Sequence, residues 1–326
     1  MIPTLLGITF ACFSLIQFVP GGPVEQFIVR LQSHNANTGT SNEKSISEDE
    51  VENIKKYYGF DQPFMVRYGK WLGNIFKGNF GDSYFYEEPV LDVITQRFPI
   101  SLFFGLSSFF LSYLICIPLG VKKALHQGSY FDIFTSVLTY IGYVIPSYAL
   151  GILLIIFFCG GSFLDLFPMT GIKSDDHDQL SFFGQLLDYV HHLLLPLICY
   201  MASQFAVLSL LMKNSLLEEI KKEYVRSSQL RGASYKKSVM KHAFRNSLIP
   251  IATGLGSIFS VMFAGALLIE RVFDIDGMGL LFYNSIVNRD YNVVMGLILL
   301  ISITNLIGRL FSDLLYAWID PRIRFN

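Results

Sequence analysis

One basic segment of the chain, residues 224–250, has the composition of a docking element. It contains arginine and lysine side chains on either side of a single glycine, Gly232, and it lies between two long apolar runs. Glycine permits a backbone turn that other residues resist, and Ser234 can cap a helix that begins at Tyr235. The pattern predicts two short helices joined at a corner, which can dock in a groove of a partner protein and transmit its motion. The alternative is a basic loop that holds anionic lipid headgroups.

The apolar residues of these two predicted helices indicate which sides pack against the rest of the chain. The second helix is expected to run from Tyr235 to about Asn246, with its lysines facing away. The expected packing positions are Tyr224, Val225 and Leu230 in the first helix and Val239, Met240 and Phe244 in the second.

Catalytic and metal-binding patterns are weak in the rest of the chain. The motifs H-E-x-x-H, G-x-S-x-G and the phosphate loop G-x-x-x-x-G-K-[ST] are absent, so the chain is not expected to be an enzyme. The acidic run 175–178 could bind a metal ion, but a solvated acidic loop is the simpler explanation and is preferred. His191 and His192 point to different faces of a helix and make a poor metal pair. No metal site is therefore expected, and the cysteines, which lie in apolar runs, are interpreted as small buried side chains: Cys12, Cys116, Cys159 and Cys199.

The composition is that of a polytopic membrane protein. Of the 326 residues, 52% are hydrophobic and only 16% charged, and the mean hydropathy is +0.45. Uniformly apolar runs near the roughly 20 residues that cross a bilayer are helices rather than alternating barrel strands. The chain is therefore predicted to be all-α with six transmembrane helices. The expected spans are 2–19, 99–121, 133–158, 192–212, 248–269 and 291–308.

The distribution of lysine and arginine predicts the orientation of these spans. The short connections 122–130 and 213–247 and the C-terminal end are basic, whereas 160–190 holds one lysine against several aspartates. Because basic loops stay in the cytoplasm, both termini are expected to be cytoplasmic. The first span lacks the basic region and cleavage site of a signal peptide, so it is expected to remain as a helix, with the native start upstream or the helix short at its cytoplasmic end.

The long connection 20–98 is expected to have structure of its own outside the cytoplasm. Residues 33–47 are polar and predict a flexible insertion, and a capping box at Ser47 predicts a helix that ends at Gly59. Pro63 can open a second, amphipathic helix, whose apolar face comprises Met65, Tyr68, Leu72, Ile75 and Phe76. Each proline within a span is expected to favour a kink, namely Pro118, Pro146 and Pro196. The expected domains are 1–96, a transmembrane domain at 97–318 that contains the basic loop 213–247, and a cytoplasmic tail at 319–326.

The basic segment resembles a known motif, the cytoplasmic coupling loop of the permeases of ATP-binding cassette importers. Within that family it is similar to the oligopeptide and dipeptide branch. Arg226-Ser227-Ser228 replaces the Glu-Ala-Ala of the general family, as is usual in the peptide branch, so a role of that glutamate does not carry over. The residues that match the branch pattern are Tyr224, Val225, Arg226, Gly232, His242, Arg245, Asn246 and Pro250.

Further matches lie in order along the chain. They include the Pro-Gly-Gly-Pro at 20–23, the Gly-x-x-Gly-x-Ser stretch at 78–83, the outer loop at 273–291 and Asp-Pro-Arg at 320–322. The runs 160–168 and 213–215 look most like the permeases of microcin C and oligopeptide importers of Gram-negative bacteria.

The resemblance implies a type I importer transmembrane domain in the bacterial inner membrane, non-catalytic and without a cofactor of its own. It implies a second homologous permease, two ATPase subunits that bind ATP and magnesium, and an extracytoplasmic peptide-binding protein, with no nucleic acid. The implied ATPase-coupling residues are Tyr224, Arg226, Ser228, Arg231, Gly232, Ala233, Ser234, His242, Arg245 and Asn246. Contact with the binding protein is expected at Glu270, Asp276, Gly277 and Gly279.

Three alternatives remain at this point. A relative in the same family could import dipeptides or nickel rather than longer peptides. An ion-coupled secondary transporter would place carboxylates within its spans, whereas Asp132, Glu270 and Asp313 lie near span ends. An intramembrane enzyme would need one of the absent catalytic motifs.

Overall fold

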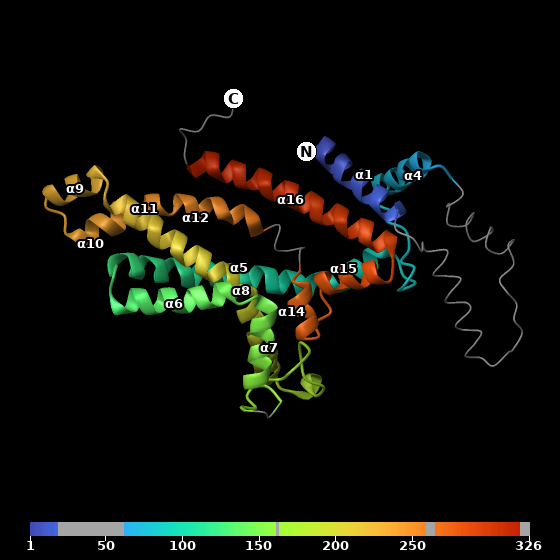
Figure 1. Ribbon diagram of the computed structural model, residues 1–326, viewed down its shortest axis with the longest axis horizontal. Helices are drawn as coiled ribbons and strands as arrows, with labels where there is room; N and C mark the ends of the chain where they lie inside the picture. The colour runs from blue at the N-terminus through green and yellow to red at the C-terminus, as the bar shows by residue number, and fades with distance from the viewer. Residues whose placement is uncertain (19–61, 161–162, 259–264, 320–326) are drawn as a thin grey trace, which may run out of the picture. The chain divides into compact units, whose positions relative to one another are not determined.

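The computed structural model describes residues 1–18, 62–160, 163–258 and 265–319. Within these ranges the secondary structure is helical apart from one isolated bridge between Asp82 and Pro89. The insertion predicted at 33–47 and the helix predicted from Ser47 to Gly59 lie outside the described residues. The elements of Figure 1 are α1 (Ile2–Phe18), α4 (Phe64–Phe76), α5 (Val90–Leu125), α6 (Tyr130–Val144), α7 (Ser147–Phe158), η1 (His177–Gln179), α8 (Phe182–Ile220), α9 (Glu223–Leu230), α10 (Tyr235–Ser238), the π-helical turn η2 (Val239–Ala243), α11 (Phe244–Ser247), α12 (Ile249–Thr253), η3 (Gly254–Ser257), α14 (Leu267–Val272), α15 (Met278–Val287) and α16 (Tyr291–Ile319).

Three helices have the length and composition of membrane spans, namely α5, α8 and α16. They confirm the second, fourth and sixth predicted spans, and α5 and α8 extend well beyond the predicted limits with 36 and 39 residues. The helix α1 has 17 residues, slightly fewer than the roughly 20 that cross a bilayer. The fifth predicted span is described only as α12, η3 and the start of α14, because residues 259–264 lie outside the described ranges.

The third predicted span is sharply bent. Its two helices, α6 and α7, meet at an angle of 105°. Pro146 stands at the junction and has no N–H to continue the helix, while its carbonyl accepts the N–H of Leu150 as α7 begins. The kink predicted at Pro146 is therefore confirmed, whereas Pro118 and Pro196 lie inside the continuous helices α5 and α8.

The chain forms two compact units. Unit 1 comprises residues 1–97 and 281–303, and unit 2 comprises residues 98–280 and 304–326. Unit 1 thus groups residues 281–303 with the N-terminal part of the chain, so the units are not continuous in sequence.

Unit 1 contains α1 packed against α4 through aromatic rings. Phe10 and Phe13 each lie about 5.5 Å from Tyr68, measured between ring centroids, and the Tyr68 hydroxyl donates to the carbonyl of Leu6 at 3.2 Å. The helix predicted to open at Pro63 is thus confirmed. Two of the residues expected on its apolar face, Met65 and Phe76, are instead 64% and 86% exposed.

Within unit 1, hydrogen bonds join two motifs that lie far apart in the sequence, the stretch 78–83 and the end of the outer loop. Asp290, which precedes α16, is fully buried and accepts hydrogen bonds from the Ser83 hydroxyl and from the backbone N–H of Phe85 at 3.0 Å. The side chain of Asn292 donates to the carbonyl of Asp82 at 2.8 Å. The segment 78–83 is therefore held at the start of α16 by buried polar groups.

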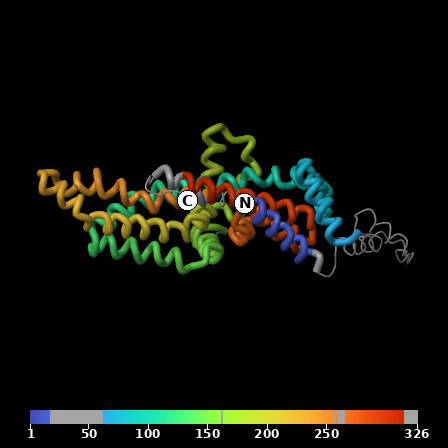
Figure 2. The backbone as a smooth tube through the Cα atoms, turned by 90° about the horizontal axis from the view of Figure 1, so that it is seen from above, coloured from blue at the N-terminus to red at the C-terminus, as the bar shows by residue number. Residues whose placement is uncertain are grey.

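Unit 2 is organised along α8. Figures 1 and 2 place α9 and α10 at one end of this helix and α7 with the connection that follows it at the other end. Each end has its own apolar core. The core near α9 and α10 contains Cys116, Ala124, Leu208, Met212, Leu216, Val225, Val239, Ala243 and Ile251, and the core at the other end contains Phe104, Cys159, Leu195, Cys199, Ile269, Phe273 and Ile275.

Candidate coupling loop

The corner predicted at Gly232 is present and has a specific hydrogen-bond pattern. Gly232 has φ +90°, in the left-handed region that favours glycine. Its N–H bonds to the carbonyl of Gln229 at 2.8 Å, and the N–H of Ala233 bonds to that of Ser228 at 3.3 Å. These two bonds satisfy the last carbonyls of α9 and form a Schellman motif, so the glycine ends the helix and sets the direction of the chain that follows.

The second arm begins as predicted and then departs from a regular α-helix. The Ser234 hydroxyl accepts the N–H of Lys237 at 3.4 Å and caps α10. The single helix expected from Tyr235 to Asn246 is instead α10, the π-turn η2 and α11. A π-turn changes which side chains face inward, and Met240, expected to pack, is 41% exposed.

Polar contacts join the two arms to each other and to α8. The Ser238 hydroxyl donates to that of Ser228 at 3.2 Å, and both serines are buried. The Ser215 hydroxyl, on α8, donates to the carbonyl of Ser247 at 2.9 Å. These hydrogen bonds therefore attach the loop to the end of α8.

The Tyr224 hydroxyl strengthens the same attachment. It donates to Glu219 at the end of α8 and accepts the side-chain N–H of Asn246 at 3.1 Å. Burial, together with the hydrogen bond to Glu219, raises the pKa of Tyr224 to about 12, so the hydroxyl remains a donor at neutral pH. Tyr224 and Asn246, two residues of the recognised pattern, thus have a structural role at the base of the loop.

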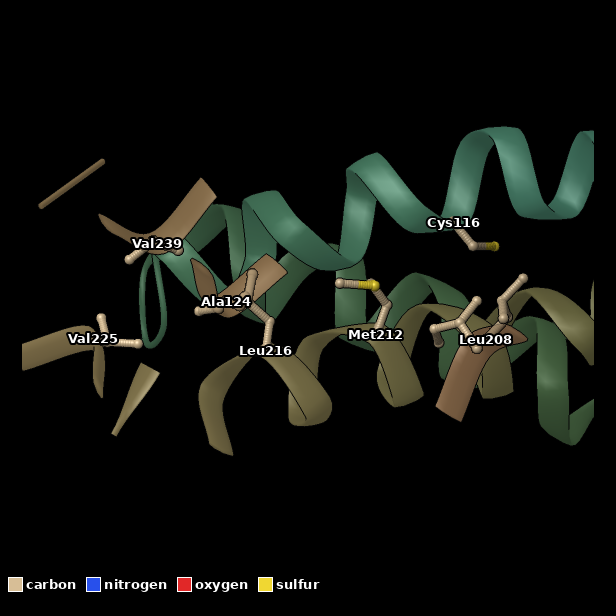
Figure 3. Packing of buried hydrophobic residues seen from close by; sticks show 9 residues of the cluster. Cys116, Ala124, Leu208, Met212, Leu216, Val225 and Val239 are labelled. Carbon is tan, nitrogen blue, oxygen red and sulfur yellow. The ribbon is translucent and has the colours of Figure 1, made fainter. Parts of the chain in front are cut away.

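Apolar side chains fill the space between these arms and the ends of the long helices. Figure 3 shows Val225 and Val239 beside Ala124 of α5 and Leu216 of α8. Val225, Val239 and Leu216 are each at most 1% exposed. Because of this packing, the corner is held rigidly against α8. A movement of the corner is therefore transmitted to that helix.

The part of the loop that remains uncovered is basic and also carries exposed apolar side chains, of which Leu230 is the most exposed. Leu230, expected to pack, is 81% exposed at the end of α9 and lies next to Arg231. Of the predicted coupling residues, Ser228 is buried and Tyr224, Ala233 and His242 are half-buried. The exposed ones are Arg226, Arg231, Gly232, Ser234, Arg245 and Asn246.

An ion pair near the base of the loop was not predicted. The ammonium group of Lys213 on α8 lies 2.7 Å and 2.8 Å from the two carboxylate oxygens of Asp132 at the start of α6. The Ser129 hydroxyl caps α6 by accepting the N–H of Asp132. Sequence alone gave no signal for this pair, because its residues lie 81 positions apart.

At the other end of unit 2, the residues expected to contact a binding protein separate into two groups. Glu270, Gly277 and Gly279 are buried, so in this conformation they offer no surface to a partner, and for them the expectation is not supported. Asp276 is exposed, as are Arg271 and Asp274, which sequence reasoning did not single out. Only the exposed residues of this corner remain candidates for such a contact.

One residue of the acidic run 175–178, His177, is buried. His177 turns inward and lies 2.6 Å from Asp188 of α8, and His192 lies 3.1 Å from the same carboxylate. Ser174 also donates to Asp188, at 2.7 Å. Among the described residues, no group of three or more histidine, cysteine, aspartate or glutamate side chains could hold a metal ion.

Comparison with known proteins identifies the family. Residues 116–325 match the family described as "binding-protein-dependent transport system inner membrane component". The chain is 42% identical to the peptidoglycan transport system permease protein YejB of Agrobacterium fabrum and 38% identical to the inner membrane ABC transporter permease protein YejB of Escherichia coli O157:H7, in each case over 100% of this chain and 96% of the relative. It is 31% identical to the oligopeptide transport system permease protein AppB of Bacillus subtilis, over 99% of this chain and 96% of the relative. The chain therefore belongs to the inner-membrane components of binding-protein-dependent transport systems.

Proposed function

We propose that this chain is a permease subunit of an ATP-driven peptide importer and that α9 to α11 dock on a cytoplasmic ATPase. The observation that supports this most directly is the Gly232 corner. It is a capped, hydrogen-bonded helix–turn–helix element that is packed onto the end of α8 and presents basic and apolar groups outward. A loop that only held lipid headgroups would need the charge but not this rigid attachment.

The roles of the other subunits follow from the family and from the residues of this chain. The chain has no phosphate-binding loop, so ATP and magnesium would bind to partner ATPase subunits. A second permease would complete the pathway, and an extracytoplasmic binding protein would deliver the substrate. In this arrangement the termini and the loop 213–247 face the cytoplasm, and the corner around Asp276 faces the opposite side.

Peptides are the substrate class that the relatives favour. The names of the similar permeases refer to oligopeptide, dipeptide and peptidoglycan transport. We propose peptides or peptide-containing fragments as the cargo of this importer. Competition of uptake between a labelled oligopeptide and a peptidoglycan-derived muropeptide would distinguish the two kinds of cargo.

The first experiment is purification of the tagged chain from its native membranes in mild detergent, followed by identification of every subunit that accompanies it. Wild type is expected to recover an ATPase with a phosphate-binding loop and a second permease. Leu230→Asp places a charge at the most exposed apolar residue of the proposed docking face, so it is expected to lose most of the ATPase.

The matched control is Tyr130→Ser. Tyr130 is 94% exposed at the start of α6, on the same expected side of the membrane but outside the coupling loop. It is expected to recover the ATPase at the wild-type level. Recovery of wild type without any ATPase, even after cross-linking, would contradict the proposed function. Full recovery with Leu230→Asp would contradict the docking face.

A further inference from the structure

The carboxyl group of Glu270 lies at the centre of a hydrogen-bonded junction in unit 2. The residue is fully buried on α14. It accepts the backbone N–H of Ala266 at 3.0 Å and that of Leu280 at 2.7 Å. It also accepts the hydroxyl of Tyr200, on α8, at 3.0 Å. A buried carboxyl group without such donors would be strongly destabilising, so the site requires all of these elements to be in place.

Three glycines around this carboxyl group show how closely the backbone approaches it. A Cβ atom added to Gly277 would lie 2.6 Å from Cδ of Glu270, and one added to Gly265 would lie 2.7 Å from Oε1. A Cβ atom on Gly279 would lie 2.6 Å from the backbone nitrogen of Leu267. These contacts leave no room for a Cβ atom, so Gly277 and Gly265 leave space for the Glu270 side chain, and Gly279 leaves space for the backbone of Leu267.

The junction also satisfies the start of α15. The first N–H groups of a helix have no partner within the helix and need one from elsewhere. The N–H of Met278 bonds to the Ser101 hydroxyl of α5 at 2.8 Å, while those of Gly279 and Leu280 bond to Glu270. Glu270 therefore fixes the chain from 265 to 280, which carries the exposed Asp276.

Tyr200 connects this corner to the helix that leads to the coupling loop. Its ring stacks on Phe104 of α5, with centroids 5.0 Å apart and planes 9° from parallel. The same helix, α8, continues without a break to Ile220, where Ser215 and Glu219 hold the coupling loop. One helix thus joins the Glu270 junction to the proposed ATPase-docking corner.

We propose that the hydrogen bond from Tyr200 to Glu270 positions the corner 265–280 on α8, so that a movement of the coupling loop changes the surface presented to the binding protein. This inference rests on the proposed function. Glu270 and Tyr200 act as positioning residues: neither needs to touch the substrate, the binding protein or ATP.

The test uses the complete importer in lipid nanodiscs with Tyr200→Phe, which removes the hydroxyl but retains the ring that stacks on Phe104. Spin labels at Arg271→Cys and Leu187→Cys, both exposed, report the distance between the corner and α8. Wild type is expected to give one narrow distance distribution, and Tyr200→Phe a broader one. Stimulation of ATP hydrolysis by peptide-loaded binding protein is expected to fall roughly tenfold, while hydrolysis without binding protein is unchanged.

Tyr148→Phe is the matched control, because Tyr148 is 40% exposed on α7 and its hydroxyl has no part in the junction. It is expected to match wild type in both measurements. A distance distribution or a stimulation that is unchanged in Tyr200→Phe would overturn the inference. The distance distribution judges the junction independently of ATP hydrolysis, whereas failure of the proposed function would already appear as wild-type chain that purifies without an ATPase.

Discussion

At the scale of single residues, the backbone conformation of Gly232 can be predicted from the sequence and tested by substitution. Its φ of +90° is strained for any residue with a Cβ atom, yet an added Cβ would meet nothing within 4 Å. Substitution should therefore act through backbone conformation alone, at a cost of about 1 kcal/mol or more. Uptake measured at equal membrane levels is expected to fall in the order glycine, asparagine, alanine and valine, because asparagine tolerates this conformation best.

An alanine variant that transports as well as the asparagine variant would contradict this conformational explanation. The corner itself could be predicted from sequence, because glycine followed by a capping serine is a local signal. The exposure of Leu230 and the burial of Glu270 could not be predicted in this way. Both depend on where residues far away in the chain lie in the folded protein. Glu270 illustrates the point: a charged residue in a predicted outer loop suggests contact with a partner, but its donors come from α8 and α15.

At the scale of elements, the attachment of residues 78–89 to the start of α16 gives a second prediction. Asp290→Ala would remove the acceptor for Ser83 and Phe85 and the residue that precedes the first turn of the helix. We expect a loss of about 2–4 kcal/mol in the stability of this region, because buried donors would be left without partners. Limited proteolysis in detergent should show faster cleavage within 78–89.

Asp82→Ala is the appropriate comparison, because the Asp82 side chain is exposed and only its backbone carbonyl is bonded to Asn292. Equal cleavage rates for the two variants would contradict the assigned role of Asp290. The elements themselves were largely predictable, since apolar composition located α5, α8 and α16 and Pro146 located the bend. The extra length of α8 at its start was not predictable, because Asp188 in its second turn is held by His177 and Ser174, which come from the preceding connection.

At the scale of the whole molecule, the charge distribution predicts which ends of the helices face the cytoplasm. Exposed positions on each expected side can be tested individually: Tyr130 and Leu230 for the cytoplasmic side, and Asp178 for the outer side. Each is replaced by cysteine in a chain whose partly exposed Cys12 has been changed to alanine. The native Cys116, Cys159 and Cys199 are buried and are expected to remain unreactive.

A membrane-impermeant maleimide applied to intact spheroplasts should label Asp178→Cys and leave Tyr130→Cys and Leu230→Cys unmodified. After permeabilisation all three should react, which shows that the two protected positions are accessible from the inner side. The argument depends on basic loops being retained in the cytoplasm. Labelling of Leu230→Cys in intact spheroplasts would place the corner outside, where no ATPase could dock, and would contradict both the orientation and the proposed coupling role of α9 to α11.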